Sequence, residues 1–92
     1  MIRLNCFFQA NSAEDYKKAL VAAVKLTEKS KKHEGNIAYD TFQSSTRSDV
    51  FMICETWENE DVLKKHSATP EFIENVAIIN ECGKMEIESF NF

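Results

Sequence analysis

The order in which the hydrophobic period changes along the chain constrains its fold more than any other feature. Residues 1–9 (MIRLNCFFQ) are strand-like, with apolar side chains at both even and odd positions, as in a central strand covered on both faces. Residues 11–35 then switch to helical spacing between a serine cap and a terminating glycine. Residues 36–44 and 49–57 are two further strands joined by the polar turn STRS, which predicts a hairpin.

After this hairpin the chain is helical in two pieces and then strand-like again. Residues 59–68 and 69–83 have helical spacing, the second with Pro70 at its first helical position, and residues 84–92 close as a fourth strand. The resulting order is that of the α+β ferredoxin-like unit, a split β-α-β sandwich. We therefore predict a four-stranded antiparallel sheet with the first and third strands in the middle and the helices on one face.

Composition and charge favour one ordered domain, residues 1–92, in the cytoplasm. Charged residues make up 28% and hydrophobic residues 43%, with two glycines and one proline. The net charge of −4 argues against binding to nucleic acid or to an anionic membrane. No segment is apolar enough to span a membrane, and the first residues lack a signal-peptide core. The widely spaced Cys6, Cys54 and Cys82 are expected to be free thiols.

One face of the predicted sheet is left without helices to cover it. We expect this face to carry Leu4, Cys6 and Phe8 together with Met52 and Cys54. Such a face is too apolar to leave in water, and a second copy of the same sheet would cover it. We therefore predict a homodimer in which two sheets pack face to face.

Three side chains are expected to converge on a cavity between the helices and the sheet. His66 lies four residues after Val62 and three after Leu63, so it shares their apolar helix face. If the face of the first strand that carries Asn5 coincides with the face of the third strand that carries Trp57, these two lie side by side beneath the helices. Packing alone explains a histidine or a tryptophan there, whereas a buried amide needs hydrogen-bonding partners.

Other residues are candidates for binding a substrate. Tyr39 and Asp40 alternate along the second strand, so one of them faces the helices, and a tyrosine there would hydrogen-bond a substrate oxygen. Glu55 lies two residues before Trp57 in the same strand, so both side chains are expected to point to the same face of the sheet. The aromatic residues expected in the pocket wall are Phe7, Phe72 and Phe90. His33, beside lysines at a helix end, is expected in solvent. The sequence has no glycine-rich phosphate loop, no Ser-His-Asp order and no metal-ligand spacing.

Nearly the whole chain resembles the antibiotic biosynthesis monooxygenase family of dimeric α/β barrel proteins. The resemblance is carried by EGNIAYDTFQS, by FMICETWENEDVLKKHSATPEF and by MEIESF. It implies a ferredoxin-like fold, a homodimer whose sheets form a barrel, and a pocket between helices and sheet in each subunit.

The resemblance also favours an enzyme, and the leading hypothesis is a monooxygenase that uses no metal or flavin. Its partners would be oxygen and a small apolar or aromatic substrate, a quinol or an aromatic polyketide-like molecule. His66 would remove a proton from the substrate, and Asn5 and the indole N–H of Trp57 would stabilise the resulting oxyanion. Glu55 would orient the imidazole.

Three alternatives remain open from the sequence. Haem-degrading relatives suggest haem as cofactor, with His66 as iron ligand, Trp57 against the macrocycle and Asn5 at the distal ligand. Relatives that isomerise a phosphorylated autoinducer sugar suggest a phosphate site, for which Arg3 or Lys65 would supply the cation. The last alternative is a protein that binds a small molecule without catalysis.

Overall fold

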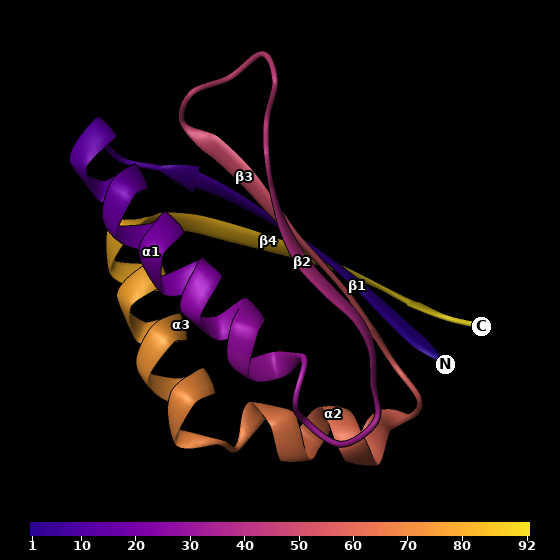
Figure 1. The fold of residues 1–92 in the computed structure, drawn as a ribbon. Helices are drawn as coiled ribbons and strands as arrows, with labels where there is room; N and C mark the ends of the chain where they lie inside the picture. The colour runs from indigo at the N-terminus through magenta and orange to yellow at the C-terminus, as the bar shows by residue number, and fades with distance from the viewer.

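The computed structural model describes residues 1–92 and shows four strands and three helices (Figure 1). Along the chain the elements are β1 (Ile2–Ala10), α1 (Ala13–Ser30), β2 (Asn36–Gln43), β3 (Val50–Trp57), α2 (Glu60–Ser67), α3 (Pro70–Cys82) and β4 (Gly83–Asn91). The predicted order of strands and helices is confirmed.

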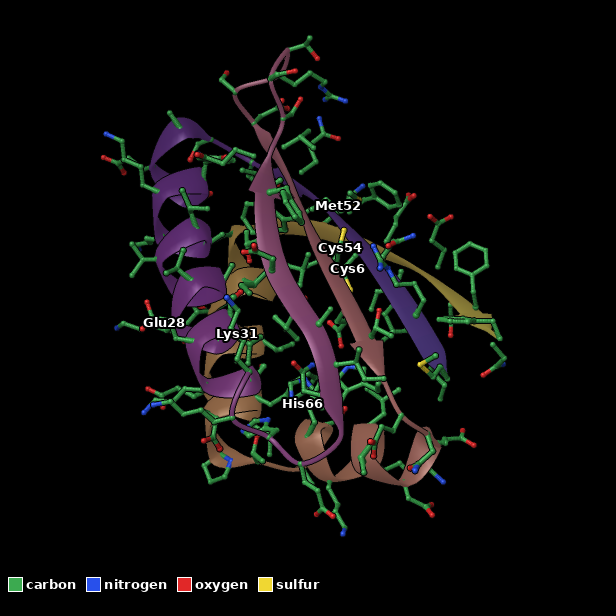
Figure 2. The ribbon with its side chains drawn as sticks, turned by 45° about the vertical axis from the view of Figure 1, so that its right-hand side comes forward. Cys6, Glu28, Lys31, Met52, Cys54 and His66 are labelled. Atoms are coloured by element: carbon green, nitrogen blue, oxygen red, sulfur yellow. The ribbon has the colours of Figure 1, made fainter.

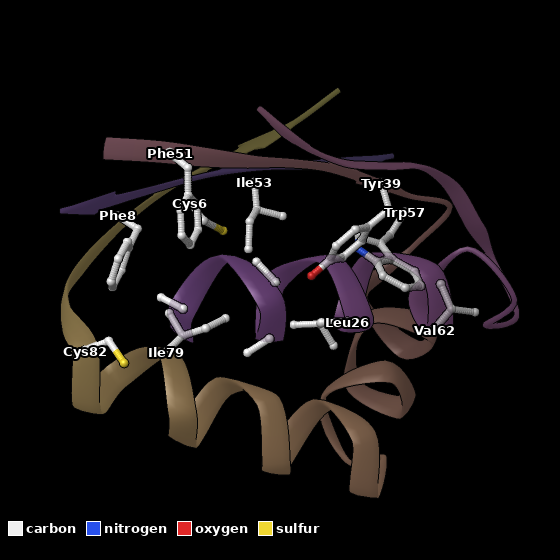
Figure 3. Close-up of a cluster of buried hydrophobic side chains, with 13 residues drawn as sticks. Cys6, Phe8, Leu26, Tyr39, Phe51, Ile53, Trp57, Val62, Ile79 and Cys82 are labelled. Carbon is white, nitrogen blue, oxygen red and sulfur yellow. The ribbon is translucent and has the colours of Figure 1, made fainter. Parts of the chain in front are cut away.

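The strands form one antiparallel sheet in the order β2-β3-β1-β4. The first and third strands are therefore central, as predicted, and the fold is the ferredoxin-like α+β fold. In Figure 1, α1 and α3 lie side by side across one face of the sheet, and α2 lies near the end of the molecule where α1 finishes. The other face carries no helix, as Figure 3 shows from the side.

Local capping chemistry explains where the helices begin. The side-chain oxygens of Ser12, Asn59 and Thr69 accept hydrogen bonds from backbone N–H groups in the first turns of α1, α2 and α3. Pro70 follows the third cap, at a position where its missing N–H costs no hydrogen bond. After α1 the chain turns at Gly35, whose φ of +78° lies in the left-handed region that favours glycine.

The register between β1 and β3 decides which side chains face the helices. Every pair joins residues of opposite parity, so the even-numbered residues of β1 lie opposite odd-numbered residues of β3; Leu4, for example, lies opposite Glu55, and Cys6 opposite Ile53. Directly opposed residues share a face, so the even positions of β1 and the odd positions of β3 both point toward the helices. Figure 3 shows Phe8 and five other labelled side chains of the sheet reaching down toward α1 and α3.

This register corrects one expectation for the face without helices. Leu4, Cys6 and Phe8 lie on the helix side, whereas Met52 and Cys54 lie on the open face, so the five do not form one surface. The open face instead combines polar and exposed aromatic residues, which are Arg3, Asn5, Phe7, Gln9, Phe42, Lys84, Glu86, Glu88 and Phe90.

The core between sheet and helices is built largely from aromatic and small side chains. Phe8 stacks on Phe51 with ring centroids 4.6 Å apart, and both are almost completely buried. Ala19, Ala22 and Ala23 of α1 are buried and bring this helix close to its neighbours. None of the helices has the length and apolar composition needed to cross a membrane.

Candidate functional site

A cavity of about 330 Å³ lies between the helices and the sheet. Eleven of its fourteen lining residues are hydrophobic, so it suits an apolar ligand of modest size. The lining is Leu4, Cys6, Leu26, Tyr39, Ile53, Glu55, Leu63, Ser67, Phe72, Val76, Ile79, Asn80, Met85 and Ile87. A larger hollow of about 650 Å³ lies between α1 and α3, but its charged residues are mostly exposed and it contains none of the predicted site residues.

Glu55 is the one charged residue in the cavity lining, and it is only 5% exposed. Its carboxylate accepts a hydrogen bond from Trp57 Nε1 at 2.8 Å and a weak one from Cys6 Sγ at 3.8 Å. Strand alternation places Glu55 and Trp57 on one face, which is why the indole reaches the carboxylate. Burial raises the pKa of Glu55 above its ordinary value, and the hydrogen bond from Trp57 opposes that shift.

Cys6 and Tyr39 are neutral hydrogen-bond donors beside this carboxylate. Burial, reinforced by the charge of Glu55, raises the pKa of Cys6 to about 12. The same two causes raise the pKa of Tyr39, whose hydroxyl also lies near Ser30. The carboxylate is thus surrounded by groups that keep their protons at neutral pH.

His66, in the last turn of α2, lies behind the cavity wall rather than in it. Its ring packs against Trp57, Phe72 and Tyr39 at centroid distances of 4.4, 5.0 and 5.7 Å, and it is 1% exposed. Figure 2 shows it between α2 and the sheet, near the end of α1. Burial lowers the pKa of His66 to about 4, and the neighbouring His33 contributes a smaller part of that shift. The imidazole is therefore neutral at pH 7.

His33 is part of this cluster, contrary to the expectation that it lies in solvent. Its Nδ1 is 2.8 Å from Nδ1 of His66, and its Nε2 is 3.7 Å from Oε2 of Glu71. The His33 side chain is only 16% exposed. No local pattern indicates this contact, because the two histidines are 33 residues apart and meet only through the packing of α2 below the loop after α1.

The predicted convergence of Asn5 with Trp57 and His66 is wrong. Asn5 lies on the open face, where its Oδ1 accepts from Arg3 Nε at 3.1 Å and its Nδ2 donates to Glu88 Oε1 at 3.2 Å. The physical reason is the β1–β3 register, which places an odd residue of β1 on the opposite face from an odd residue of β3.

Phe7 and Phe90 are also placed outside the cavity. They are 43% and 49% exposed and share the open face with Asn5. The structure therefore brings together Glu55, Trp57 and His66 with Tyr39 and Phe72, and it separates the other three predicted residues from them.

The residues present do not fit the haem arrangement expected from the sequence. His66 already meets His33 through Nδ1, its Nε2 is enclosed, and Trp57 and Phe72 pack on its ring. Asn5, the expected distal residue, lies across the sheet from it. No group of three or more His, Cys, Asp or Glu side chains is placed to hold a metal ion.

Neither cation considered for a phosphate group lines the cavity. Arg3 lies on the open face, where it donates to Asn5 and to Thr56 Oγ1. Lys65 pairs with Glu34 at 3.5 Å, and both side chains are more than two-thirds exposed. The cavity therefore offers no Lys or Arg side chain for the phosphate group of a phosphorylated sugar.

Known proteins resemble this chain in sequence and in fold. The family model described as "Antibiotic biosynthesis monooxygenase" matches residues 1–77. The Bacillus subtilis (strain 168) protein "Putative monooxygenase YcnE" is 31% identical over 72 residues, which cover 78% of this chain and 75% of that protein.

Solved structures extend the comparison to the whole fold. A Bacteroides thetaiotaomicron protein, described as conserved, of unknown function and "Possible Oxidoreductase", has 54% identity and a TM-score of 0.94, covering 99% of this chain and 96% of that one. SnoaB, a cofactor-independent oxygenase from Streptomyces nogalater, superposes with a TM-score of 0.76 over 99% of this chain and 91% of that chain, but at 11% identity this likeness concerns the fold alone. The family match over most of the chain is decisive, and the protein belongs to the antibiotic biosynthesis monooxygenase family.

Proposed function

We propose that the protein is a monooxygenase that oxidises a small apolar molecule with an acidic phenolic or hydroquinone hydroxyl, without metal, haem or flavin. The single observation that carries the proposal is Glu55, a buried carboxylate with a raised pKa that lines an apolar cavity. Perturbed titratable groups in such cavities are the usual candidates for proton transfer. Family membership and the description of the B. subtilis relative support the same class of reaction.

Glu55 is the proposed proton acceptor because it lines the cavity, whereas His66 lies behind Tyr39 and Phe72. Its raised pKa brings its basicity closer to that of a phenol, which favours the transfer. On accepting the proton the carboxylate becomes neutral, so it does not repel the anion that it has produced. The proposal thus replaces His66 by Glu55 as the group that contacts the substrate.

The substrate anion would then supply all the electrons that oxygen needs. When an anthrone CH₂ becomes C=O, or a hydroquinone becomes a hydroxyquinone, the substrate loses four electrons and O₂ gains four. One oxygen atom stays in the product and the other leaves as water together with the two hydrogen atoms that the substrate loses. No external reductant is required. Tyr39, which remains protonated, would donate a hydrogen bond to the anion in the dry cavity.

Trp57 has a different task from the one expected from the sequence. Its indole N–H donates to Glu55 and is therefore engaged away from a substrate oxyanion. We assign it to positioning the carboxylate and holding its pKa down.

The test is oxygen uptake on a panel of hydroquinones and hydroxylated anthrones, with Glu55→Gln as the variant. Glutamine keeps the shape of the side chain and an acceptor for Trp57 but cannot take a proton, so turnover should fall by roughly 100-fold or more. Phe42→Leu, on the open face, is the matched control and should keep wild-type turnover. Unchanged turnover in Glu55→Gln would remove Glu55 from the mechanism.

Tight binding of these compounds without oxygen uptake by the wild-type protein would instead favour a binding protein. The apolar cavity would then recognise the ligand, and Glu55 would only accept a hydrogen bond from its hydroxyl. Fluorescence of Trp57, the only tryptophan, reports such binding because its indole touches the carboxylate in the cavity wall.

A further inference from the structure

We propose that Asn80 selects the substrate by hydrogen-bonding a second polar oxygen, at the end of the molecule opposite to the hydroxyl that meets Glu55. The inference rests on the proposed function, which places the acidic hydroxyl of the substrate at Glu55. It narrows the substrate class to elongated aromatic molecules that carry an oxygen at each end.

The inner end of the cavity is defined by the register of the sheet. Tyr39 lies directly opposite Glu55, and the two residues are only 3% and 5% exposed. Phe72 belongs to the same end, because its ring centroid lies 5.0 Å from that of His66, which in turn lies 5.7 Å from that of Tyr39. The start of α3 therefore covers the end of the cavity at which Glu55 would meet the substrate.

One stripe of α3 forms the cavity wall from this inner end to the far end. Phe72, Val76 and Asn80 recur at intervals of four residues, and all three line the cavity. An α-helix rises about 1.5 Å per residue, so Phe72 and Asn80 lie about 12 Å apart along α3. In Figure 3, Ile79, the neighbour of Asn80, lies toward one end of the space between α3 and the sheet, and Tyr39 lies toward the other.

Asn80 is the polar group at the far end of an otherwise apolar wall. The polar residues of the lining are Glu55, Ser67 and Asn80. Ser67 ends α2 just before α3 begins, so it lies toward the inner end, and Asn80 is the one polar lining residue on α3. Asn80 is exposed, as is Ile87 of β4 at 63%, so the cavity opens to solvent beside these two residues.

The Asn80 amide is free to bind a ligand. Its side chain makes no hydrogen bond within the chain, whereas Asn75 on the same helix donates from Nδ2 to the backbone oxygen of Glu71 at 2.8 Å. A free amide both donates and accepts, so it can recognise a hydroxyl or a carbonyl oxygen. Two fused rings with an oxygen at each end, and a hydrogen bond of about 2.8 Å beyond each oxygen, match the length of the stripe.

The first experiment measures binding by titration calorimetry under nitrogen, so that no oxidation occurs. Its probes are 2-naphthol and 2,6-dihydroxynaphthalene, which share one skeleton and differ in the second oxygen. The wild type should bind the diol more tightly. In Asn80→Leu, which keeps the approximate size of the side chain and suits a helix, this preference should fall by about fivefold.

Glu81→Leu is the matched control, at an exposed neighbouring position that faces the hollow between α1 and α3 instead of the cavity. Its ratio of dissociation constants for the two naphthols should equal that of the wild type. A general loss of stability would weaken both ligands alike and leave the ratio unchanged. The inference would be overturned by a wild type that does not prefer the diol, by an unchanged ratio in Asn80→Leu, or by the same fall in Glu81→Leu.

The second experiment measures oxygen uptake with the same two naphthols and separates this inference from the proposed function. In Asn80→Leu the ratio of kcat/KM values should shift by the factor seen in binding, while kcat for 2-naphthol should stay at the wild-type value. Uptake by the wild type with an unshifted ratio in Asn80→Leu would contradict the role of Asn80 alone. A shift in binding without any uptake by the wild type would contradict the proposed function and leave Asn80 as a ligand-binding residue.

Discussion

Glu55 and His66 are two buried titratable residues whose pKa values are moved by the same cause, burial, with opposite consequences for the pH dependence of stability. The pKa of His66 falls to about 4 from an ordinary value of 6.5, so between these two pH values the unfolded chain binds more protons than the folded one. For Glu55 the pKa rises, so it is the folded chain that binds more protons above pH 4.5.

The first prediction concerns His66. Its contribution to the free energy of unfolding should be fully present above pH 6.5 and should decrease as the pH falls to about 4, by roughly 3 kcal/mol in all. Urea unfolding at a series of pH values measures this slope. In His66→Gln the slope between pH 4 and 6.5 should be shallower than in the wild type, and an identical slope would contradict the assignment.

The second prediction concerns Trp57, whose hydrogen bond lowers the pKa of Glu55. Trp57→Phe removes the N–H donor but keeps an aromatic ring against His66. The acid limb of the pH–rate profile, which reports ionisation of Glu55, should therefore move to higher pH. A limb that stays in place while the rate falls would mean that the indole acts on something other than this carboxylate.

At the scale of single residues, sequence reasoning succeeded where only local spacing mattered. Strand alternation placed Glu55 with Trp57, and helical spacing placed His66 with Val62, and each of these residues is buried. Asn5 was misplaced because its face depends on the register between two strands distant in sequence, and a shift of one residue reverses every side chain. His33 was missed because a loop residue shows no periodicity from which a contact can be read.

At the scale of the secondary-structure elements, the sequence predicted where each helix begins to within two residues because helix starts depend on local chemistry, but the first helix ends at Ser30, five residues before the predicted stop at Gly35. Each capping side chain accepts a hydrogen bond from a backbone N–H group only three residues further along the chain. The predicted second helix, residues 59–68, differs from the observed Glu60–Ser67 by its cap residues alone. A cavity between helices and sheet was expected, but its volume and lining were not predictable in the same way, since they depend on how α2 and α3 pack together on the sheet.

The third prediction concerns the turn between α1 and β2. A Cβ atom added at Gly35 would lie 2.5 Å from Cγ2 of Val62, and the φ of +78° adds strain for residues other than glycine. Gly35→Ala should therefore lower the free energy of unfolding by about 1 kcal/mol or more, measured by urea unfolding. Gly35→Asn separates the two causes because asparagine tolerates this φ and suffers the same overlap. A stability of Gly35→Ala equal to the wild type would contradict both.

At the scale of the whole molecule, the open face of the sheet remains the predicted dimer interface, although its composition differs from the one expected. Exposed aromatic side chains there, those of Phe7, Phe42 and Phe90, alternate with charged residues. Exposed aromatic groups on an uncovered sheet favour association, and the charges restrict the geometries in which two copies fit.

The fourth prediction follows from this face. The protein should be a homodimer by light scattering, and Phe7→Glu should shift it to the monomer by placing a charge in the middle of the interface. Val21→Glu, at a position 57% exposed on α1, is the matched control and should leave the dimer intact. A monomeric wild type would contradict the predicted dimer. Equal dissociation by both variants would mean that the open face is not the dimer interface.

Under the proposed mechanism, the burial of Glu55 also sets heat resistance against activity. An ionised carboxylate enclosed in an apolar cavity destabilises the folded chain, and the uncharged Glu55→Gln keeps its shape without that cost. At pH 8 the inactive variant should therefore melt at a higher temperature than the wild type, as calorimetry would measure. A stability-guided redesign of this protein would replace this residue early, and under the proposed mechanism the redesigned protein would be more stable but unable to start the reaction.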